Sequence, residues 1–451
     1  MAGRMEFQLD LGKSPARNPA PSRRGAMRLL VIGNFSGRPA SEKKPLADRA
    51  THQVDLDNLD RVLARLAPRL DLAAGRIEFT ELEDFHPDSL YRRLDLFGAL
   101  RQARAQPADA GEDLLGRLLG KPVAAPGAPS RPQPAPGLEA FIEAIVAPHV
   151  VADTAQATRS HLAAVDSAIA EAMRRLLHDP GFQQLESAWR GVQWLISSLE
   201  LDETLQLHLF DATREELIAD VVAAQGQVAQ TGLQRALADR WRNQPGAEAW
   251  TAVVGLYAFG PSDADIGLLA ALGLVAAQAG GPLLAEGRRE LAQADDPARA
   301  GWQALRGSEA APWIGLAAPR LLLRLPYGKS GEPIASFGFE EFVGAPVHED
   351  YLWGNPGLAV ARLIGRAFTV RGWNFEAGEE REIGDLPAFT FVQDGERELQ
   401  ACAEAYLGEQ AGQALLDAGL MPLMSHRHRN AATLMRLQSV ASPAARLAFA
   451  R

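Results

Sequence analysis

Apolar residues recur along this chain at two spacings, and each spacing predicts a different element. The stretch "HDPGFQQLESAWRGVQWL", residues 178–195, contains the longer spacing. Asp179 and Pro180 are typical of a helix start, because the carboxylate accepts free backbone N–H groups and Pro suits the first turn. The apolar positions that follow at steps of three and four share one helix face: Phe182, Leu185, Trp189, Val192 and Leu195.

Glu186 and Arg190 stand four residues apart in the same stretch. This spacing predicts an i,i+4 ion pair, which we expect to be solvated beside the buried apolar face. A catalytic interpretation would need a nucleophile or base nearby, and the stretch offers none. We therefore expect a core helix here.

Shorter apolar runs predict strands elsewhere in the chain. Continuous or alternating apolar runs predict strands over 27–35, 76–82, 205–209 and 250–259. Helical periodicity predicts helices over 56–66, 88–105, 138–146, 165–177 and 263–280. The alternation of both kinds of element predicts an α/β fold.

A Pro- and Ala-rich stretch, "PVAAPGAPSRPQPAPG" (122–137), separates these elements into two groups. Such a composition predicts an extended, semi-rigid linker. We therefore expect two α/β units, over 27–121 and 138–451, joined by this linker. Residues 1–26 precede them as a flexible arm.

Composition narrows the function classes. The chain has 451 residues and a formal net charge of −10, which argues against a general nucleic-acid binder. Its single cysteine, Cys402, lies in the helical-looking "LQACAEAYL" and is expected to be a small core residue. Neither a membrane-spanning stretch nor a signal peptide is recognisable, so a cytoplasmic protein is expected.

Three stretches resemble ligand-binding motifs, but each lacks residues or spacing that the motif requires. "IGNFSGRP" (32–39) lacks the spacing of a phosphate loop and predicts a tight turn. "DLDNLD" (55–60) lacks the Gly and Glu of a calcium loop, so its aspartates are expected to cap a helix. His426 and His428 have no third ligand nearby, and the flanking arginines would repel a cation. We predict no catalytic, cofactor-binding or metal-binding residue, and hence no enzyme.

Two groups of motifs resemble the small and the large subunit of the contractile sheath of bacterial type VI secretion. Roughly residues 5–105 are similar to the small subunit, through "LLVIGNFSGRP", "VDLDNLDRVLARLAPRLDL" and "IEFTELEDFHPDSL", with Leu59 where that family usually has Phe. Roughly residues 138–440 are similar to the large subunit. The motifs follow the family's order: "LLHDPGFQQLESAWRGVQWLI", "LYAFGPSDADIGLLAAL", "WQALRGSEAAPWIGLAAPRLLLRLPYG", "YLWGNPGLAVARLIGRAF" and "GLMPL".

The resemblance implies two sheath-protomer-like α/β units in one chain. In that family the two subunits form a heterodimer that polymerises around an inner tube, and neighbours exchange terminal strands. The alternating Phe7, Leu9 and Leu11 are expected to form such an exchange strand, which would add to a free sheet edge. The large-subunit family continues beyond the end of this chain, so a shortened large unit is expected.

The expected function is a non-enzymatic structural component of the secretion apparatus, acting as an accessory protein, a cap or a variant sheath subunit. Expected partners are sheath subunits, baseplate or inner-tube proteins, and an AAA+ recycling unfoldase through the helix at 138–146. The structural or interface candidates are Trp189, Arg190, Arg320, Arg324, Tyr327 and Trp353. Arg320 and Arg324 line either an inner protein-facing surface or a solvated face. The alternative is an enzyme or ligand-binding protein on an α/β scaffold.

Overall fold

A computed structural model describes residues 25–72, 75–105, 156–240, 248–293, 295, 298–393 and 395–449. The α/β class predicted from the sequence is confirmed. The arm strand with Phe7, Leu9 and Leu11, the linker at 122–137 and the helix expected at 138–146 lie outside the described residues. None of the helices in the described ranges is long and apolar enough to cross a bilayer.

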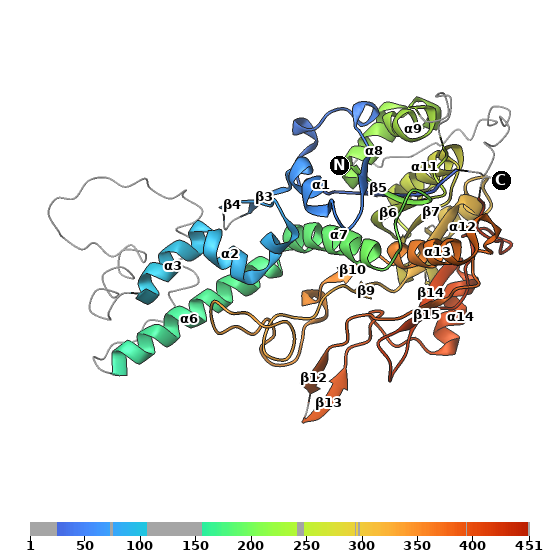
Figure 1. The fold of residues 1–451 in the computed structure, drawn as a ribbon. Coiled ribbons are helices and arrows are strands. Elements are labelled where there is room, and N and C mark those ends of the chain that lie inside the picture. The colour runs from blue at the N-terminus through green and yellow to red at the C-terminus, as the bar shows by residue number, and fades with distance from the viewer. Residues whose placement is uncertain are drawn as a thin grey trace.

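A nine-stranded sheet organises the molecule (Figure 1). Its spatial order is β11-β15-β14-β8-β7-β6-β1-β5-β2, and the six strands from β14 to β5 are parallel. The antiparallel strands β2, β15 and β11 complete the two edges. The strand bounds are β1 Met27–Gly33, β2 His52–Val54, β5 Leu205–Asp211, β6 Ala252–Phe259, β7 Leu283–Gly287, β8 Ile314–Ala318, β11 Glu382–Ile383, β14 Leu420–Ser425 and β15 Ala432–Leu434.

Strand β1 lies in the middle of this sheet, between β5 and β6. It pairs along its whole length with β5, from Met27 opposite Leu205 to Gly33 opposite Asp211, and all seven of its residues are buried. This explains its continuous apolar sequence, because a central parallel strand is covered on both faces. The predicted two-unit arrangement is not confirmed, since strands from both predicted units form one sheet.

Two layers of helices cover the sheet. Leu29 and Val31 of β1 face a core with helices α7 (Pro180–Ser197) and α13 (Gly357–Arg371). Leu30 and Ile32 point to the other core, with α8 (Arg214–Ala223), α11 (Asp263–Ala279) and α12 (Ala298–Arg306). The alternation along one strand therefore serves both layers.

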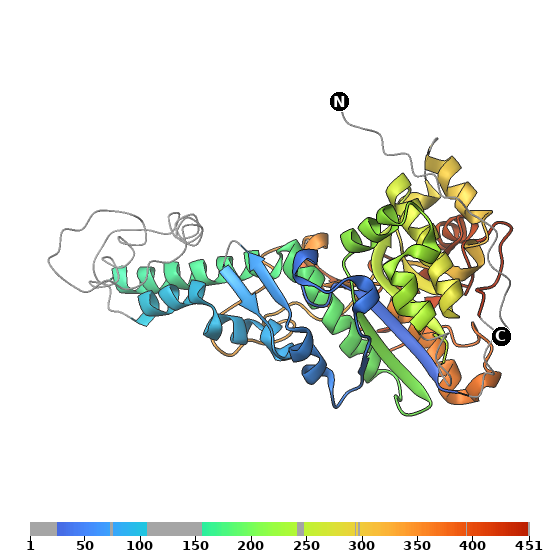
Figure 2. The same ribbon diagram turned by 90° about the horizontal axis from the view of Figure 1, so that it is seen from above.

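A helical arm extends to one side of the sheet (Figure 2). It contains α2 (Pro87–Arg93), α3 (Asp95–Ala105), the long α6 (Gln156–Leu177) and the hairpin β3 (Arg69–Leu72)–β4 (Gly75–Glu78). The single helix predicted over 88–105 is wrong. Leu94 is extended, with ψ 135°, and separates α2 from α3. The break lets Tyr91 pack on Phe337, at 4.7 Å between ring centroids, while α3 packs on α6.

The remaining elements are short. They are α1 Leu59–Leu66, α9 Gly232–Gln234, α14 Glu409–Asp417, and the pairs β9 Leu321–Leu322 with β10 Trp353–Gly354 and β12 Thr390–Gln393 with β13 Glu396–Leu399. The helix expected around Cys402 is wrong, because these backbone groups bond elsewhere: Leu322 N donates to Cys402 O, and Ala403 N donates to Ser425 Oγ. Cys402 itself is buried, as expected.

Candidate functional site

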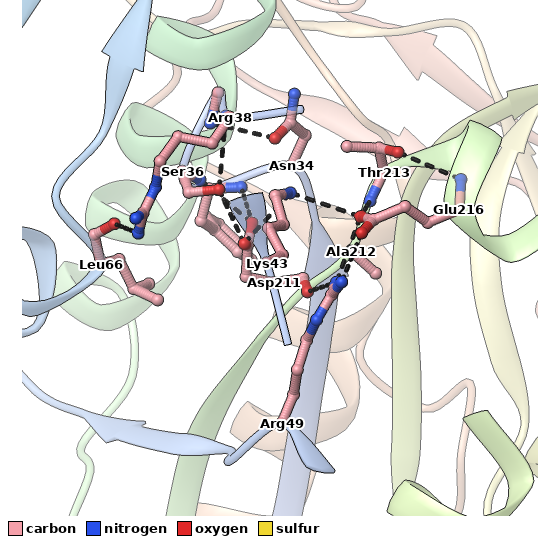
Figure 3. A network of polar contacts seen from close by, with 12 residues as sticks. Asn34, Ser36, Arg38, Lys43, Arg49, Leu66, Asp211, Ala212, Thr213 and Glu216 are labelled. Atoms are coloured by element: carbon pink, nitrogen blue, oxygen red, sulfur yellow. Dashed lines mark hydrogen bonds and ion pairs between the residues drawn. The ribbon is translucent and has the colours of Figure 1, made fainter. Parts of the chain in front are cut away.

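The loop after β1 is fixed to the end of β5 by one carboxylate. Asp211 Oδ1 accepts hydrogen bonds from the backbone N–H groups of Phe35 (2.8 Å) and Ser36 (3.0 Å), and Oδ2 accepts from Ser36 Oγ at 2.7 Å. Figure 3 shows Asp211 directed into this loop. The bonds join the N-terminal segment, defined as residues 25–105, to the C-terminal segment, defined as residues 156–449. We call their contact region the junction.

Two cations of the N-terminal segment strengthen the junction (Figure 3). Lys43 Nζ lies 3.2 Å from Asp211 Oδ2 and 3.3 Å from Glu216 Oε2. Arg49 binds both oxygens of Glu216 and donates to the Asp211 carbonyl at 2.7 Å. Burial opposes ionisation of Glu216, but Arg49, the Thr213 N–H and Lys43 outweigh it and lower the pKa of this carboxyl.

Glu216 also serves its own helix. Thr213 Oγ1 accepts from Glu216 N at 3.2 Å, and Glu216 Oε2 accepts from Thr213 N at 2.9 Å, which forms a capping box at the start of α8. The Glu216 carboxylate therefore caps the N-terminus of α8 and also forms the ion pair with Arg49. The capping bond restricts the orientation of the carboxylate that Arg49 binds.

Trp189 supplies the apolar part of the junction. It lies on α7 with no exposed surface, and its indole Nε1 donates to Phe35 O at 3.0 Å. The Phe35 and Trp189 rings meet edge-on, with centroids 5.3 Å apart. A tryptophan of the C-terminal segment thus closes over the turn that follows β1.

The predicted Glu186–Arg190 ion pair is present, at 2.6 Å between Nε and Oε1, but the solvated environment expected for it is wrong. Glu186 has no exposed surface. Arg324 Nε also reaches Glu186 Oε1, at 3.0 Å, and Arg324 binds both oxygens of Glu341 at 2.8 and 3.0 Å. Arg190 donates to the Tyr327 hydroxyl at 2.7 Å. The pair is therefore part of a buried ionic cluster.

Glu341 stays ionised in this cluster although it is buried. Burial would raise the pKa of Glu341, but Arg324, the neighbouring His178 and a hydrogen bond from the Tyr327 N–H together lower it to about 2. Arg324 is 6% exposed, so it does not lie on a solvated face. The cluster holds α7 against the 320–341 segment through compensated charges.

Arg320 lies apart from this cluster, together with Trp353. Its guanidinium donates to Glu404 Oε1 at 2.6 Å and lies 5.8 Å from the centroid of the Trp353 ring. His348 Nε2 lies 2.9 Å from the same oxygen, and Trp353 Nε1 donates to His348 O. Of the six candidates that the structure describes, it therefore brings Arg190, Arg324 and Tyr327 together, pairs Arg320 with Trp353, and places Trp189 at the junction.

Sequence reasoning missed Lys43, Arg49, Asp211 and Glu216. The spacing Thr213-x-x-Glu216 is a readable capping-box signal, and Asp211 directly follows an alternating apolar run. Neither signal predicts which cation, more than 150 residues away in the sequence, pairs with the carboxylate. Long-range pairing is the part that a local pattern does not contain.

A cleft of about 890 Å³ opens beside the junction. It lies at the carboxyl ends of β1, β6, β7 and β8, where open parallel sheets commonly bind ligands, and its lining includes Asn34, Tyr257, Glu286 and Arg320. Within the described ranges, no group of three or more His, Cys, Asp or Glu side chains is arranged to hold a metal ion. His426 instead bonds Thr433 Oγ1 at 2.8 Å.

Two family models match this chain. The VipB (EvpB) tail sheath N-terminal domain matches residues 159–441, and VipA of the type VI secretion system matches residues 25–122. The type VI secretion system sheath protein TssC1 of Pseudomonas aeruginosa is 31% identical over 315 residues, which cover 65% of this chain and 63% of TssC1. Sheath protein TssB1 of the same organism is 26% identical over 124 residues, or 23% of this chain and 72% of TssB1.

Proposed function

The chain belongs to the tail sheath family of the type VI secretion system and has both a small-subunit-like and a large-subunit-like part, and from this membership we propose that it is a non-enzymatic structural component of a contractile secretion apparatus. It spans 63% of the length of TssC1. Its action as an accessory protein, a cap or a variant sheath subunit, and its cytoplasmic location, are parts of the same proposal.

One observation carries this proposal: β1 of the VipA-like part is a central strand of the sheet of the VipB-like part. We propose that residues 27–121 and 138–451 correspond to the two sheath subunits, and that the Pro-rich 122–137 stretch joins them. A covalent joint fixes the stoichiometry at one to one and raises the effective concentration of each part for the other. In this arrangement the buried ion pairs of Lys43 and Arg49 join the two parts within one chain.

The six described candidate residues take structural roles in this proposal. Trp189 anchors the junction, Arg190, Arg324 and Tyr327 hold α7 to the 320–341 segment, and Arg320 with Trp353 orders the wall of the cleft. Each makes a hydrogen bond or ion pair within the chain. Phe7, Leu9 and Leu11 are proposed as an exchange strand for a neighbouring protomer.

The proposed partners are sheath subunits, with baseplate proteins, inner-tube proteins and an AAA+ unfoldase as further candidates. Negative-stain electron microscopy of the purified protein, alone and co-expressed with the two separate sheath subunits of its host, tests the assembly function. Tubes formed by the protein alone would identify a polymerising sheath subunit. Particles at the ends of sheath tubes would identify a cap or accessory protein.

Monomers that never associate with sheath, under conditions in which the two separate subunits form tubes, would overturn the proposal. A control variant makes the result interpretable: Arg429→Ala changes an exposed arginine whose ion-pair partner among the described residues is the exposed Glu382. It should leave the assembly unchanged and so serves as a control for preparation effects.

The second candidate function is ligand binding on the same α/β scaffold. The cleft of about 890 Å³ favours it, because this volume lies within the range of small-molecule sites. A sheath component with a ligand site satisfies both candidates, whereas a catalytic role would need a nucleophile or base that the sequence did not identify.

A further inference from the structure

His178 lies at the corner where helix α6 ends and helix α7 begins. Its backbone N–H donates to Arg174 O at 2.9 Å, so it directly follows the last turn of α6. Its side chain is 17% exposed, and the ring lies beside that of Phe342, with centroids 6.2 Å apart. The role of this histidine therefore depends on the groups that face its ring.

Both ring nitrogens of His178 face a carboxylate. Nε2 lies 3.5 Å from Glu341 Oε1, and Nδ1 lies 3.4 Å from Asp350 Oδ1. A neutral imidazole has one N–H donor and one lone pair, whereas the protonated ring has two donors. In the neutral form one nitrogen therefore presents its lone pair to a carboxylate oxygen, which is repulsive.

Two further observations favour the protonated ring. Nε2 of His178 is buried and forms no hydrogen bond with the described residues, so no donor among them stabilises a lone pair there. The position just after the last turn of α6 also favours a cation, because the free carbonyl groups of a helix end carry partial negative charge.

Charged groups of three elements surround His178. They are Glu171, Arg174 and Arg175 on α6, Asp179 at the start of α7, and Arg324, Glu341 and Asp350 on the facing segment. Most of them are held by other partners. Glu171 contacts both arginines of α6, at 3.4 and 3.0 Å, and the Asp179 carboxylate caps α7.

The two carboxylates that face the ring differ in the same respect. Arg324 binds both oxygens of Glu341, whose pKa is lowered to about 2, so this carboxylate is ionised and held without His178. Asp350, by contrast, has His178 as its ion-pair partner. The Asp350 contact is therefore the one that a change of charge on the ring affects most.

Glu341 and Asp350 stand directly before and directly after an exposed loop, residues 342–349. Glu341 is 1% exposed, whereas Val343 and Val347 in the loop are 75% and 54% exposed. The His178 ring contacts both ends of this loop and so ties it to the corner between α6 and α7.

We propose that His178 is a pH-sensitive clasp for the loop 342–349. The protonated ring donates towards Glu341 and Asp350 together and holds both loop ends. Loss of the proton leaves a single donor, and the Asp350 end is released because Glu341 is already fixed by Arg324. Histidine changes its charge between about pH 5 and pH 8, so the loop is held at the lower pH and freer at the higher pH.

Hydrogen exchange of the full chain, followed by mass spectrometry of peptides covering residues 342–350, tests the proposal at about pH 5.5 and about pH 8. Protection factors are compared, because they correct for the direct effect of pH on chemical exchange. We expect the protection of the loop to be about three- to tenfold lower at the higher pH. The buried strand β1, Met27–Gly33, should keep its protection and serves as the internal reference.

Two variants should abolish the pH dependence in opposite ways. His178→Gln gains no proton, so its loop should show weak protection at both pH values. Asp350→Asn places an amide donor opposite Nδ1, so that a neutral ring satisfies both sides and the loop stays protected at both. The control His348→Gln removes a histidine of the same loop that pairs with Glu404 instead, and it should keep the wild-type response.

Equal protection of the wild-type loop at the two pH values would overturn the proposal. An unchanged pH response in His178→Gln, or a response lost in His348→Gln, would overturn it as well. Far-UV circular dichroism shows whether each variant is folded. If His178→Gln is unfolded, Asp350→Asn decides the question, since a wild-type pH response there would refute the clasp. The measurement needs no sheath partner, so its failure would leave the proposed sheath function untouched.

Discussion

Replacing Trp189 with alanine tests the apolar contact that closes the junction. The ring has no exposed surface and packs edge-on against Phe35. Removing a buried tryptophan ring costs about 3–5 kcal/mol, through lost transfer free energy and the cavity left behind. Phe35 O also loses its indole donor, which adds about 1 kcal/mol or more. We expect Trp189→Ala to lower the free energy of unfolding by about 4–6 kcal/mol.

Two further variants separate these contributions. Trp189→Phe keeps one aromatic ring but removes the N–H donor and part of the buried ring volume, so it should cost less than the alanine variant, about 1–3 kcal/mol. Trp194→Ala lies on the same helix α7, but its ring is only partly buried. The control substitution should cost about 1–2 kcal/mol, because less apolar surface leaves water on folding.

Urea denaturation followed by far-UV circular dichroism measures all three variants, with the shift in midpoint converted through a common slope. Hydrogen exchange locates the effect: the amides of β1, Met27–Gly33, should lose protection in Trp189→Ala and keep it in Trp194→Ala. If Trp189→Ala were no less stable than Trp194→Ala, or if β1 kept its protection, Trp189 would not anchor the junction.

Three other predictions follow from the described contacts. Because its neighbours lower the pKa of Glu341 to about 2, ionisation of this carboxyl adds about 3 kcal/mol to the free energy of unfolding. This contribution is present above about pH 4.5 and is lost as the pH falls towards 2. The urea midpoint should therefore decline less with falling pH in Glu341→Gln than in the wild-type protein. Arg49→Met should cost about 1–3 kcal/mol by denaturation, and adding Glu216→Gln should recover part of the loss; strict additivity would argue against their coupling. Gly37→Ala, at φ 62° and with its Cβ 2.4 Å from a backbone carbonyl, should lower the melting temperature, whereas Gly338→Ala, in open space, should not.

The elements that sequence reasoning predicted well are those specified locally. Helix α7 begins as expected, because Asp179 Oδ1 accepts from the N–H groups of Gly181 and Phe182. Strands β1 and β6 follow from continuous apolar runs. In each case the residues that determine the element are close together in the sequence. The local pattern is therefore enough to predict the element.

The features that sequence reasoning missed depend on distant partners. The apolar spacing over 88–105 continues without interruption, yet Leu94 is extended, because α2 and α3 pack against different neighbours. The spacing of Glu186 and Arg190 predicts their pair, but its burial is set by Arg324, more than 130 residues later. At the junction, the capping-box spacing could have identified Glu216, whereas its pairing with Arg49 required the fold.

The central position of β1 has a consequence for synthesis on the ribosome. Its nearest hydrogen-bonding partner, β5, begins at Leu205, about 180 residues after Met27. At roughly 5–20 residues per second, β5 is made some 10–35 s after β1 has been translated. Throughout this interval the apolar "MRLLVIG" strand has neither of its neighbours in the sheet. The nascent chain therefore offers a chaperone a defined binding segment, and the sheet closes around β1 only after β5 and β6 have both emerged.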